Sequence, residues 1–162
     1  GHLRDFGFMR WQDFDGKLWE EVKVEARAAE RPYTGTIYAS DLDLKAVHIT
    51  RENVTRAGLE EAVRLRRQDF LQTRARGERG IVFLNPPYGE RLQPEALVSL
   101  YAQIGDTLKQ GYAGHDAWLL SSSQPALKAV GLRPARKWPL YNGALACQLR
   151  HYELYQGSRE KA

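Results

Sequence analysis

The spacing of apolar residues along the chain alternates between that of helices and that of strands. Residues 16–31 carry apolar side chains three or four positions apart, which predicts an amphipathic helix. The run Thr36–Ser40 predicts a short strand. Asp43 is a candidate N-cap for a helix that continues through Ala57 and stops at Gly58. Residues 62–66 then predict an edge strand.

The second half of the chain continues this alternation and ends differently. Residues 81–84 read Ile-Val-Phe-Leu, four apolar residues without polar alternation, which is typical of a parallel strand covered on both faces. Helical spacing returns over 97–108, and 116–122 predict another buried strand. Ser123 then caps a short helix. The last segment predicts two strands joined by a tight turn at Asn142-Gly143, a β-hairpin.

Strands that alternate with helices predict an α/β fold with an open, mostly parallel sheet, to which the hairpin adds an antiparallel strand. In such sheets, ligands bind beyond the carboxyl ends of the strands. Three polar motifs follow predicted strands directly: Ser-Asp-Leu-Asp at 40–43, Gln-Asp-Phe at 68–70 and Asn-Pro-Pro-Tyr at 85–88. We therefore expect all three to share one rim of the sheet.

Composition describes an ordinary globular domain. The 162 residues are 43% hydrophobic and 27% charged, enough for one domain with a core. No apolar run is long enough to span a membrane, and the first residues lack the apolar segment of a signal peptide. The single Cys147 has neither a disulfide partner nor the neighbours of a metal site. These features predict a reducing, cytoplasmic location and no membrane partner.

The net charge of +4, from 24 basic and 20 acidic residues, is unevenly distributed. Basic residues gather between positions 64 and 79, as is typical of a surface that binds a polyanion such as nucleic acid. A solvated surface explains the same charges equally well. The candidate nucleic-acid contacts are Arg64, Arg66, Arg74 and Arg76.

Acidic residues at the predicted rim suggest contacts to a nucleotide-like cofactor. A carboxylate at Asp41 has the chemistry to accept hydrogen bonds from the hydroxyls of a ribose. Asp69 has the chemistry to accept from the exocyclic amine of an adenine, and Phe70 to pack on its ring. Taken one at a time, a turn or cap aspartate and a core phenylalanine remain the simpler interpretations.

The motif at 85–88 has more specific chemistry. Pro86 and Pro87 cannot donate to a strand ladder, so the strand ends there, and the first proline keeps Asn85 out of the helical region. The Asn85 amide oxygen and a fixed main-chain carbonyl can together accept both hydrogens of an amino group. Tyr88 offers a face on which a base stacks, worth roughly 1–3 kcal/mol. The motif is therefore suited to holding an exocyclic amine toward an electrophile; a proline-rich strand end is the alternative.

Asn-Pro-Pro-Tyr after an apolar strand resembles the motif of amino-group methyltransferases that use S-adenosyl-L-methionine. The longer NPPYGERL, with FGFMRW near the start and LYNGALACQLRHYELY near the end, resembles the THUMP-associated RNA guanine methyltransferases of the RlmL type. The resemblance covers essentially the whole chain. It implies a Rossmann-like class I methyltransferase sheet and methyl transfer to the exocyclic amine of a guanine in 23S ribosomal RNA.

The resemblance also assigns roles by position. Asp41 would bind the ribose of S-adenosyl-L-methionine, and Asp69 and Phe70 would contact its adenine. Because methyl transfer is an in-line displacement, positioning should supply most of the acceleration. A base inside a helix would have to be flipped out or already unpaired. The residues that would hold the target base are Asn85, Pro86, Pro87 and Tyr88.

The chain departs from the family at its beginning. The family's methyltransferase domain starts with a strand and a glycine-rich loop that approaches the cofactor closely, and neither is found here, nor is the upstream THUMP domain. Residues 1–162 therefore resemble a partial methyltransferase catalytic domain, incomplete at its N-terminus. The absent strand would leave two strand edges unpaired, which favours self-association or pairing with the missing N-terminal segment. We expect full activity to need that segment.

Two other functions fit the same residues. Asn-Pro-Pro-Tyr also serves DNA adenine amino-methyltransferases, and basic surfaces do not distinguish RNA from DNA. A fragment that folds without binding the cofactor would instead be a non-catalytic RNA-binding piece. The sequence blocks that resemble the ribosomal RNA family favour RNA methylation over both.

Overall fold

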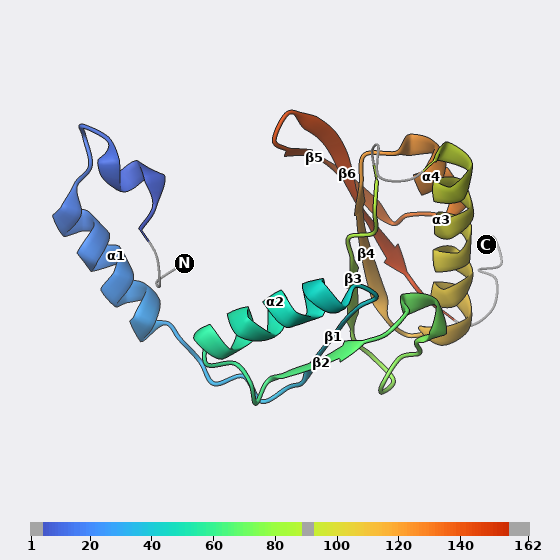
Figure 1. Ribbon diagram of the computed structural model, residues 1–162, viewed down its shortest axis with the longest axis horizontal. Helices are drawn as coiled ribbons and strands as arrows, with labels where there is room; N and C mark the ends of the chain where they lie inside the picture. The colour runs from blue at the N-terminus through green and yellow to red at the C-terminus, as the bar shows by residue number, and fades with distance from the viewer. Residues whose placement is uncertain (1–4, 89–92, 156–162) are drawn as a thin grey trace. The chain divides into compact units, whose positions relative to one another are not determined.

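The computed structural model describes residues 5–88 and 93–155 (Figure 1). The chain forms two compact units, Gly1–Ile37 and Tyr38–Ala162. Within the described ranges, no helix combines the length and the apolar character needed to cross a membrane.

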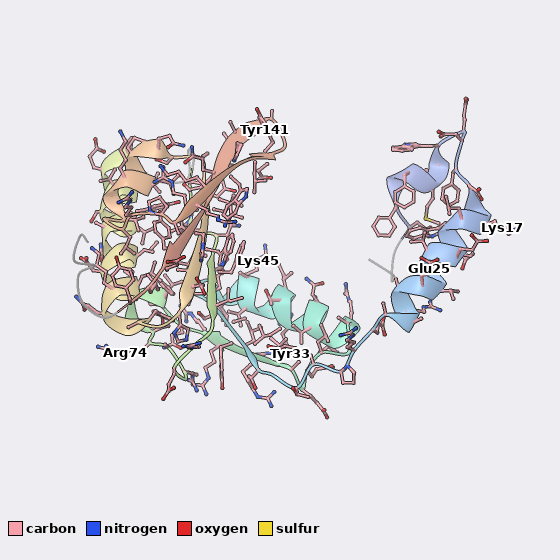
Figure 2. The ribbon with its side chains drawn as sticks, turned by 180° about the vertical axis from the view of Figure 1, so that it is seen from behind. Lys17, Glu25, Tyr33, Lys45, Arg74 and Tyr141 are labelled. Carbon is pink, nitrogen blue, oxygen red and sulfur yellow. The ribbon has the colours of Figure 1, made fainter. Side chains whose placement is uncertain are left out.

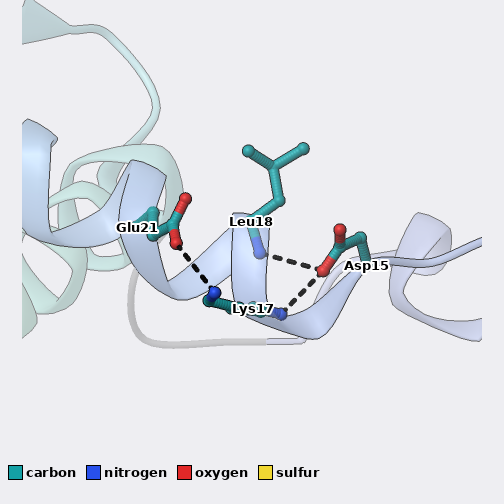
Figure 3. Close-up of polar contacts among 4 residues, drawn as sticks. All are labelled: Asp15, Lys17, Leu18 and Glu21. Atoms are coloured by element: carbon teal, nitrogen blue, oxygen red, sulfur yellow. Dashed lines mark hydrogen bonds and ion pairs between the residues drawn. The ribbon is translucent and has the colours of Figure 1, made fainter.

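The first unit contains a short 3-10 helix, η1 (Gly7–Arg10), and the helix α1 (Gly16–Ala28). Asp15 caps α1: its Oδ1 accepts hydrogen bonds from the backbone amides of Lys17 and Leu18 at 2.9 and 3.0 Å (Figure 3). These bonds satisfy two amides that have no partner within the helix. The predicted helix over 16–31 is confirmed, three residues shorter at its end.

Aromatic rings hold the first unit together. Phe8 lies at the centre, with its ring centroid 5.2 Å from Trp19, 5.3 Å from Phe6 and 6.0 Å from Phe14. None of the residues of α1 is buried, and the side chain of Val24 is 64% exposed. This unit therefore relies on ring contacts and local hydrogen bonds rather than on an enclosed core.

The second unit alternates strands and helices, as the sequence predicts. Its first strand starts and ends one residue later than expected, and Asp41 is therefore the last strand residue rather than the residue after it. Asp43 caps the next helix, Ala57 is its C-cap, and Gly58 follows in the left-handed region at φ 66°, as predicted. The elements are β1 (Ile37–Asp41), α2 (Leu44–Arg56), β2 (Val63–Arg67), η2 (Phe70–Gln72), β3 (Ile81–Leu84), α3 (Pro94–Gly111), β4 (Asp116–Ser121), α4 (Gln124–Ala129), β5 (Arg136–Asn142) and β6 (Leu145–Glu153).

The strands of the described residues form two separate sheets (Figure 1). One contains β1 and β2, and the other has the order β3-β4-β6-β5. In the larger sheet β3 is parallel to β4, whereas β6 is antiparallel to both β4 and β5. The predicted antiparallel hairpin is thus confirmed, with the turn one residue later than expected, at Gly143-Ala144. Gly143 takes φ 61°, which suits the first central position of a type II′ turn.

The prediction that β3 is covered on both faces is wrong for the described residues. Val82 and Leu84 pack against the core, but Ile81 and Phe83, which point to the opposite face, are 74% and 63% exposed. The reason is that no described element covers this face of β3, which is also an edge strand of its sheet. The two sheets therefore present an unpaired apolar edge at β3, in agreement with the expectation for an incomplete sheet.

The core lies on the other face of the larger sheet, under α3 and α4. Tyr101, Leu108, Leu119 and Leu127 are at most 1% exposed. The two helices approach closely at Gly105, where a Cβ atom would lie 1.9 Å from the carbonyl oxygen of Val130. A side chain at this position is incompatible with the observed helix spacing.

We expect Gly105→Ala to lower the free energy of unfolding by about 2 kcal/mol, because overpacking a tight contact typically costs 1–3 kcal/mol. The direction of the change is informative, because without the tight contact alanine would raise the free energy of unfolding by about 1 kcal/mol relative to glycine through its higher helix propensity. Urea denaturation measures the effect. The reverse change on the same helix, Ala102→Gly, is the control and should cost about 1 kcal/mol through helix propensity alone. A gain in stability in Gly105→Ala would contradict the tight contact.

Candidate functional site

The motif Asn-Pro-Pro-Tyr leaves the carboxyl end of β3 directly. Leu84 is the last strand residue and is partly buried in the core, whereas Asn85 is exposed. The Asn85 side-chain amide makes no hydrogen bond to another described residue, so both its oxygen and its NH₂ group are available to a ligand. The two prolines are half-buried and joined by trans peptide bonds.

A buried tyrosine fixes the motif from the core side. The Tyr101 hydroxyl on α3 lies 2.8 Å from Ser121 Oγ and donates across 3.3 Å to the carbonyl oxygen of Pro87. Burial raises the pKa of Tyr101 above its usual value, against the opposing effect of the hydrogen bond to Ser121. The hydroxyl therefore stays protonated and continues to donate at all ordinary pH values.

The hairpin holds the same motif from the other side. Asn142, the last residue of β5, donates a hydrogen bond from Nδ2 to the Tyr88 hydroxyl oxygen at 3.0 Å. The two residues are 54 positions apart in the sequence. Sequence reasoning identified Asn142 only as a turn residue and missed this contact, because no local pattern reports a pairing over such a separation.

Two buried tyrosines offer a matched comparison. The hydroxyl of Tyr152 is buried and has no partner at good hydrogen-bond geometry among the described residues. Burial raises its pKa, and the nearby Arg150 guanidinium opposes this rise as a distant hydrogen-bond donor and through its charge. We expect Tyr101→Phe to destabilise the protein by about 1 kcal/mol and Tyr152→Phe to stabilise it by a similar amount. Removing a bonded hydroxyl loses a contact, whereas removing an unbonded one relieves a desolvation cost. Urea denaturation of both variants checks this, and equal signs would contradict it.

Asp41 ends β1 and Asp69 follows β2, so both belong to the smaller sheet, which is separate from the sheet that carries Asn85. Within the described residues, the expectation that all three motifs share one rim of one sheet is therefore not met. The backbone amide of Gln68 donates to the Asp41 carbonyl at 3.1 Å, which brings the ends of β1 and β2 together. Each carboxylate also stabilises its own turn through Oδ1: Asp41 accepts from the Asp43 amide at 2.8 Å, and Asp69 from the Leu71 amide at 2.9 Å. Their Oδ2 atoms accept no hydrogen bond from the described residues. The turn role and a ligand role are therefore compatible.

Phe70 is placed differently from its neighbour Asp69. Its ring stacks on Tyr112, at the end of α3, with centroids 5.6 Å apart and an interplanar angle of 22°. The adjoining Thr73 hydroxyl and the Tyr112 hydroxyl are also hydrogen-bonded. Phe70 thus contributes to the core, and the structure gives direct support only to this packing role.

The four arginines do not surround Asn85 as one patch. The loop that carries Arg74 and Arg76 follows η2 and lies at the far end of α3, where the Ala75 amide bonds the Gly111 carbonyl at 2.8 Å. Figure 2 shows Arg74 and Tyr141 of the hairpin at opposite ends of the second unit. With 18 residues, α3 is about 27 Å long. These two arginines therefore lie at the same end of α3 as Phe70, which stacks on Tyr112, whereas Pro87 is held by Tyr101 nearer the middle of that helix.

The individual arginines also differ in their surroundings. Arg64 donates to the Glu60 carbonyl at 3.1 Å, and the guanidinium of Arg76 lies 4.6 Å from the ring centroid of Tyr38. Arg66 and Arg74 are exposed on β2 and on the loop after η2. All four charges remain accessible to a polyanion, but they would contact different parts of it.

The exposed groups match a nucleoside better than a metal. Among the described residues, no three His, Cys, Asp or Glu side chains gather in a group that would hold a metal ion. Asp41 and Asp69 each keep a carboxylate oxygen that no described residue engages, and such an oxygen is the acceptor needed for ribose hydroxyls or an amino group. The residues present therefore fit a cofactor of the S-adenosylmethionine type.

Comparisons with known proteins agree on one family. Residues 2–151 match the family described as "RMKL-like, methyltransferase domain". The chain is 37% identical over 161 residues to the "Ribosomal RNA large subunit methyltransferase K/L" of Methylococcus capsulatus, covering 95% of this chain and 22% of that protein. It thus spans about a fifth of the length of that relative.

Solved structures give the same picture. The crystal structure of SMU.472 complexed with SAH aligns with a TM-score of 0.76 and 31% identity, over 98% of this chain and 41% of that one. A protein of Listeria monocytogenes, described as a "predicted N6-adenine-specific DNA methylase", aligns with a TM-score of 0.69 and 26% identity, over 93% of this chain and 39% of that one. The Rossmann-like methyltransferase fold expected from the sequence is therefore confirmed.

Proposed function

Because the chain belongs to the RMKL-like methyltransferase domain family, we propose that it forms the target-binding part of an S-adenosylmethionine-dependent methyltransferase that acts on the exocyclic amine of a guanine in 23S ribosomal RNA. The observation that carries the proposal is the exposed, unbonded Asn85 amide at the carboxyl end of β3, with Tyr88 fixed beside it. An RNA substrate of this kind places the reaction in the cytoplasm.

The motif supplies the positioning that the reaction needs. The Asn85 amide oxygen and the carbonyl oxygen of Pro86 accept hydrogen bonds from the two N–H groups of the target amine. The lone pair of the amine then points away from the motif. As the nitrogen bonds to the methyl carbon, the carbon–sulfur bond breaks and its electron pair stays on sulfur. The nitrogen thereby gains positive charge, which these oxygens would stabilise. The amine then loses one of its held protons to solvent. Tyr88 stacks on the base and keeps it from turning.

The cofactor contributes a methyl group on a positively charged sulfur. We assign Asp41 to its ribose and Asp69 to its adenine, because both carboxylates have an oxygen that the described residues leave unengaged. One face of the Phe70 ring stacks on Tyr112. We therefore propose that Phe70 contacts the adenine through the edge of its ring. SAH in the related SMU.472 structure supports the cofactor class.

The arginines extend the RNA contact beyond the target base. Arg64, Arg66, Arg74 and Arg76 are exposed, and each phosphate that they neutralise makes binding more sensitive to salt. Because the loop of Arg74 and Arg76 contacts the C-terminal end of α3 and not the motif after β3, we assign them to RNA beyond the modified nucleotide. Replacing them should weaken binding to all sequences alike.

The unpaired edge of β3 completes the proposal. We propose that a strand from the N-terminal segment of the longer protein pairs there, and that the chain connected to this strand covers the face on which Ile81 and Phe83 are exposed. Without it, a second copy of the chain is the competing partner for the edge. Sedimentation of residues 1–162 over a range of concentrations would detect such self-association.

Methyl incorporation tests the function. The full-length protein is incubated with radiolabelled S-adenosylmethionine and either 23S ribosomal RNA or duplex DNA, and the labelled nucleoside is identified after digestion. Label in a guanosine of RNA, methylated on its exocyclic nitrogen, is the expected result. Label in no nucleic acid would overturn the enzymatic proposal and leave a non-catalytic RNA-binding role.

A second candidate is methylation of adenine in DNA. The similarity to the protein of Listeria monocytogenes favours it, since that protein is described as acting on adenine in DNA. The same experiment separates the two, because label in N6-methyladenine from DNA would replace label in guanosine from RNA.

A further inference from the structure

The hydrogen bond between Asn142 and Tyr88 links the end of the C-terminal hairpin to the target-binding motif. Asn142 Nδ2 donates to the tyrosine hydroxyl at 3.0 Å. Tyr88 is half-buried, and Asn142 is exposed. The bond is therefore a contact near the surface between two segments, and neither residue is needed to fill the core.

The hairpin is a firm support for this contact. β6 pairs with β4 along six residues and with β5 along seven, so it is bonded on both sides. Trp138 of β5 stacks on Trp118 of β4, with ring centroids 5.2 Å apart and planes 22° apart. Asn142 therefore lies at the end of a strand whose position is set by the central sheet.

Arg150 anchors the hairpin more deeply. Its guanidinium on β6 is buried and donates to the Leu127 carbonyl at 2.9 Å, to Gln124 Oε1 at 3.0 Å and to Gln148 Oε1 at 3.0 Å. A buried charge that loses such bonds is costly, so the hairpin resists movement relative to α4. Motion of the hairpin is consequently a poor way to release Tyr88.

The bond restricts the tyrosine side chain at its far end. A tyrosine turns about two side-chain bonds, and anchoring its hydroxyl limits both. A ring that already has the bound orientation avoids an ordering cost worth roughly a two- to twelvefold change in affinity. Because Asn142 donates, the phenol proton also stays free to point elsewhere.

We propose that Asn142 is a positioning residue for substrate binding, which orients the Tyr88 ring as a stacking surface for the target base. The proposal rests on the proposed function, since it gives Tyr88 a role only if that residue contacts a base. It gives the hairpin a part in substrate binding that the Asn-Pro-Pro-Tyr motif alone does not indicate.

Single and double substitutions in the full-length protein test the coupling. Asn142→Ala and Tyr88→Phe should each raise the KM for RNA about three- to tenfold, as expected for one hydrogen bond, with kcat changed less than twofold. The double variant should show the same loss as either single one, because both remove one bond. Effects that multiply in the double variant, or an unchanged KM in Asn142→Ala, would overturn the proposal.

Two further variants and a spectroscopic measurement distinguish a loss of the Asn142–Tyr88 hydrogen bond from a general disturbance of the hairpin. Asn142→Asp should keep the KM close to that of the original protein, because a carboxylate accepts a hydrogen bond from the tyrosine hydroxyl. Tyr141→Phe, the same loss of a hydroxyl one residue away, should leave KM unchanged. The exciton signal of the stacked Trp118 and Trp138 in circular dichroism reports whether the hairpin remains in place.

The outcomes also separate this proposal from the proposed function. If Tyr88→Ala abolishes methyl transfer but Asn142→Ala has no effect, the motif acts as proposed and only the role of the hairpin is wrong. If neither substitution affects methyl transfer, the assignment of the motif to the target base fails as well.

Discussion

Asn85→Ala is expected to reduce methyl transfer to RNA by about 100-fold or more, the usual cost of losing one group that stabilises charge in a transition state. The amide is exposed and makes no hydrogen bond to the described residues, so its removal disturbs no visible contact of the fold. The loss should therefore fall on kcat and leave the free energy of unfolding within about 0.5 kcal/mol of the original.

The separation of activity from stability makes this substitution decisive. Radiolabel incorporation gives kcat and the KM for RNA, and urea denaturation gives stability. Asn53→Ala, an exposed asparagine on α2, is the matched control and should leave both unchanged. A full-rate Asn85→Ala enzyme would show that another group holds the target amine, and the methylation proposal would lose its central residue.

The sequence alone predicts those features of the fold and of the candidate site that depend on neighbouring residues. Asp43 and Gly58 mark the limits of α2 because capping and left-handed turns depend on single residues. Asn85 follows its strand where the prolines require the strand to end. Such features depend on neighbours along the chain, which a sequence displays directly.

Features that depend on distant segments were not predictable in the same way. The bond from Asn142 to Tyr88 spans 54 positions, and the position of Arg74 at the far end of α3 depends on how the loop after η2 packs. The apolarity of Ile81 and Phe83 shows that they suit a covered face, but it does not show which segment covers them.

Extending the chain to include its preceding segment should lower the Kd for S-adenosylmethionine at least 100-fold relative to residues 1–162, because ligand contacts are ordered only where the sheet is complete. The family resemblance implies a strand and a glycine-rich loop in that segment, and the unpaired edge of β3 is where such a strand would bond. Isothermal titration of both proteins with S-adenosylmethionine measures the difference. Equal affinities would show that the cofactor binds without the added strand.

One substitution tells whether the added segment covers β3 itself. Phe83→Ala should change the stability of residues 1–162 by less than about 1 kcal/mol, since the ring is 63% exposed there. In the extended protein, the same change should cost about 3–5 kcal/mol, as expected for a phenylalanine removed from a core. Val82→Ala is the control, because that side chain already packs on the core and should cost a similar amount in both proteins. A small effect of Phe83→Ala in both proteins would mean that the added segment leaves this face of β3 uncovered.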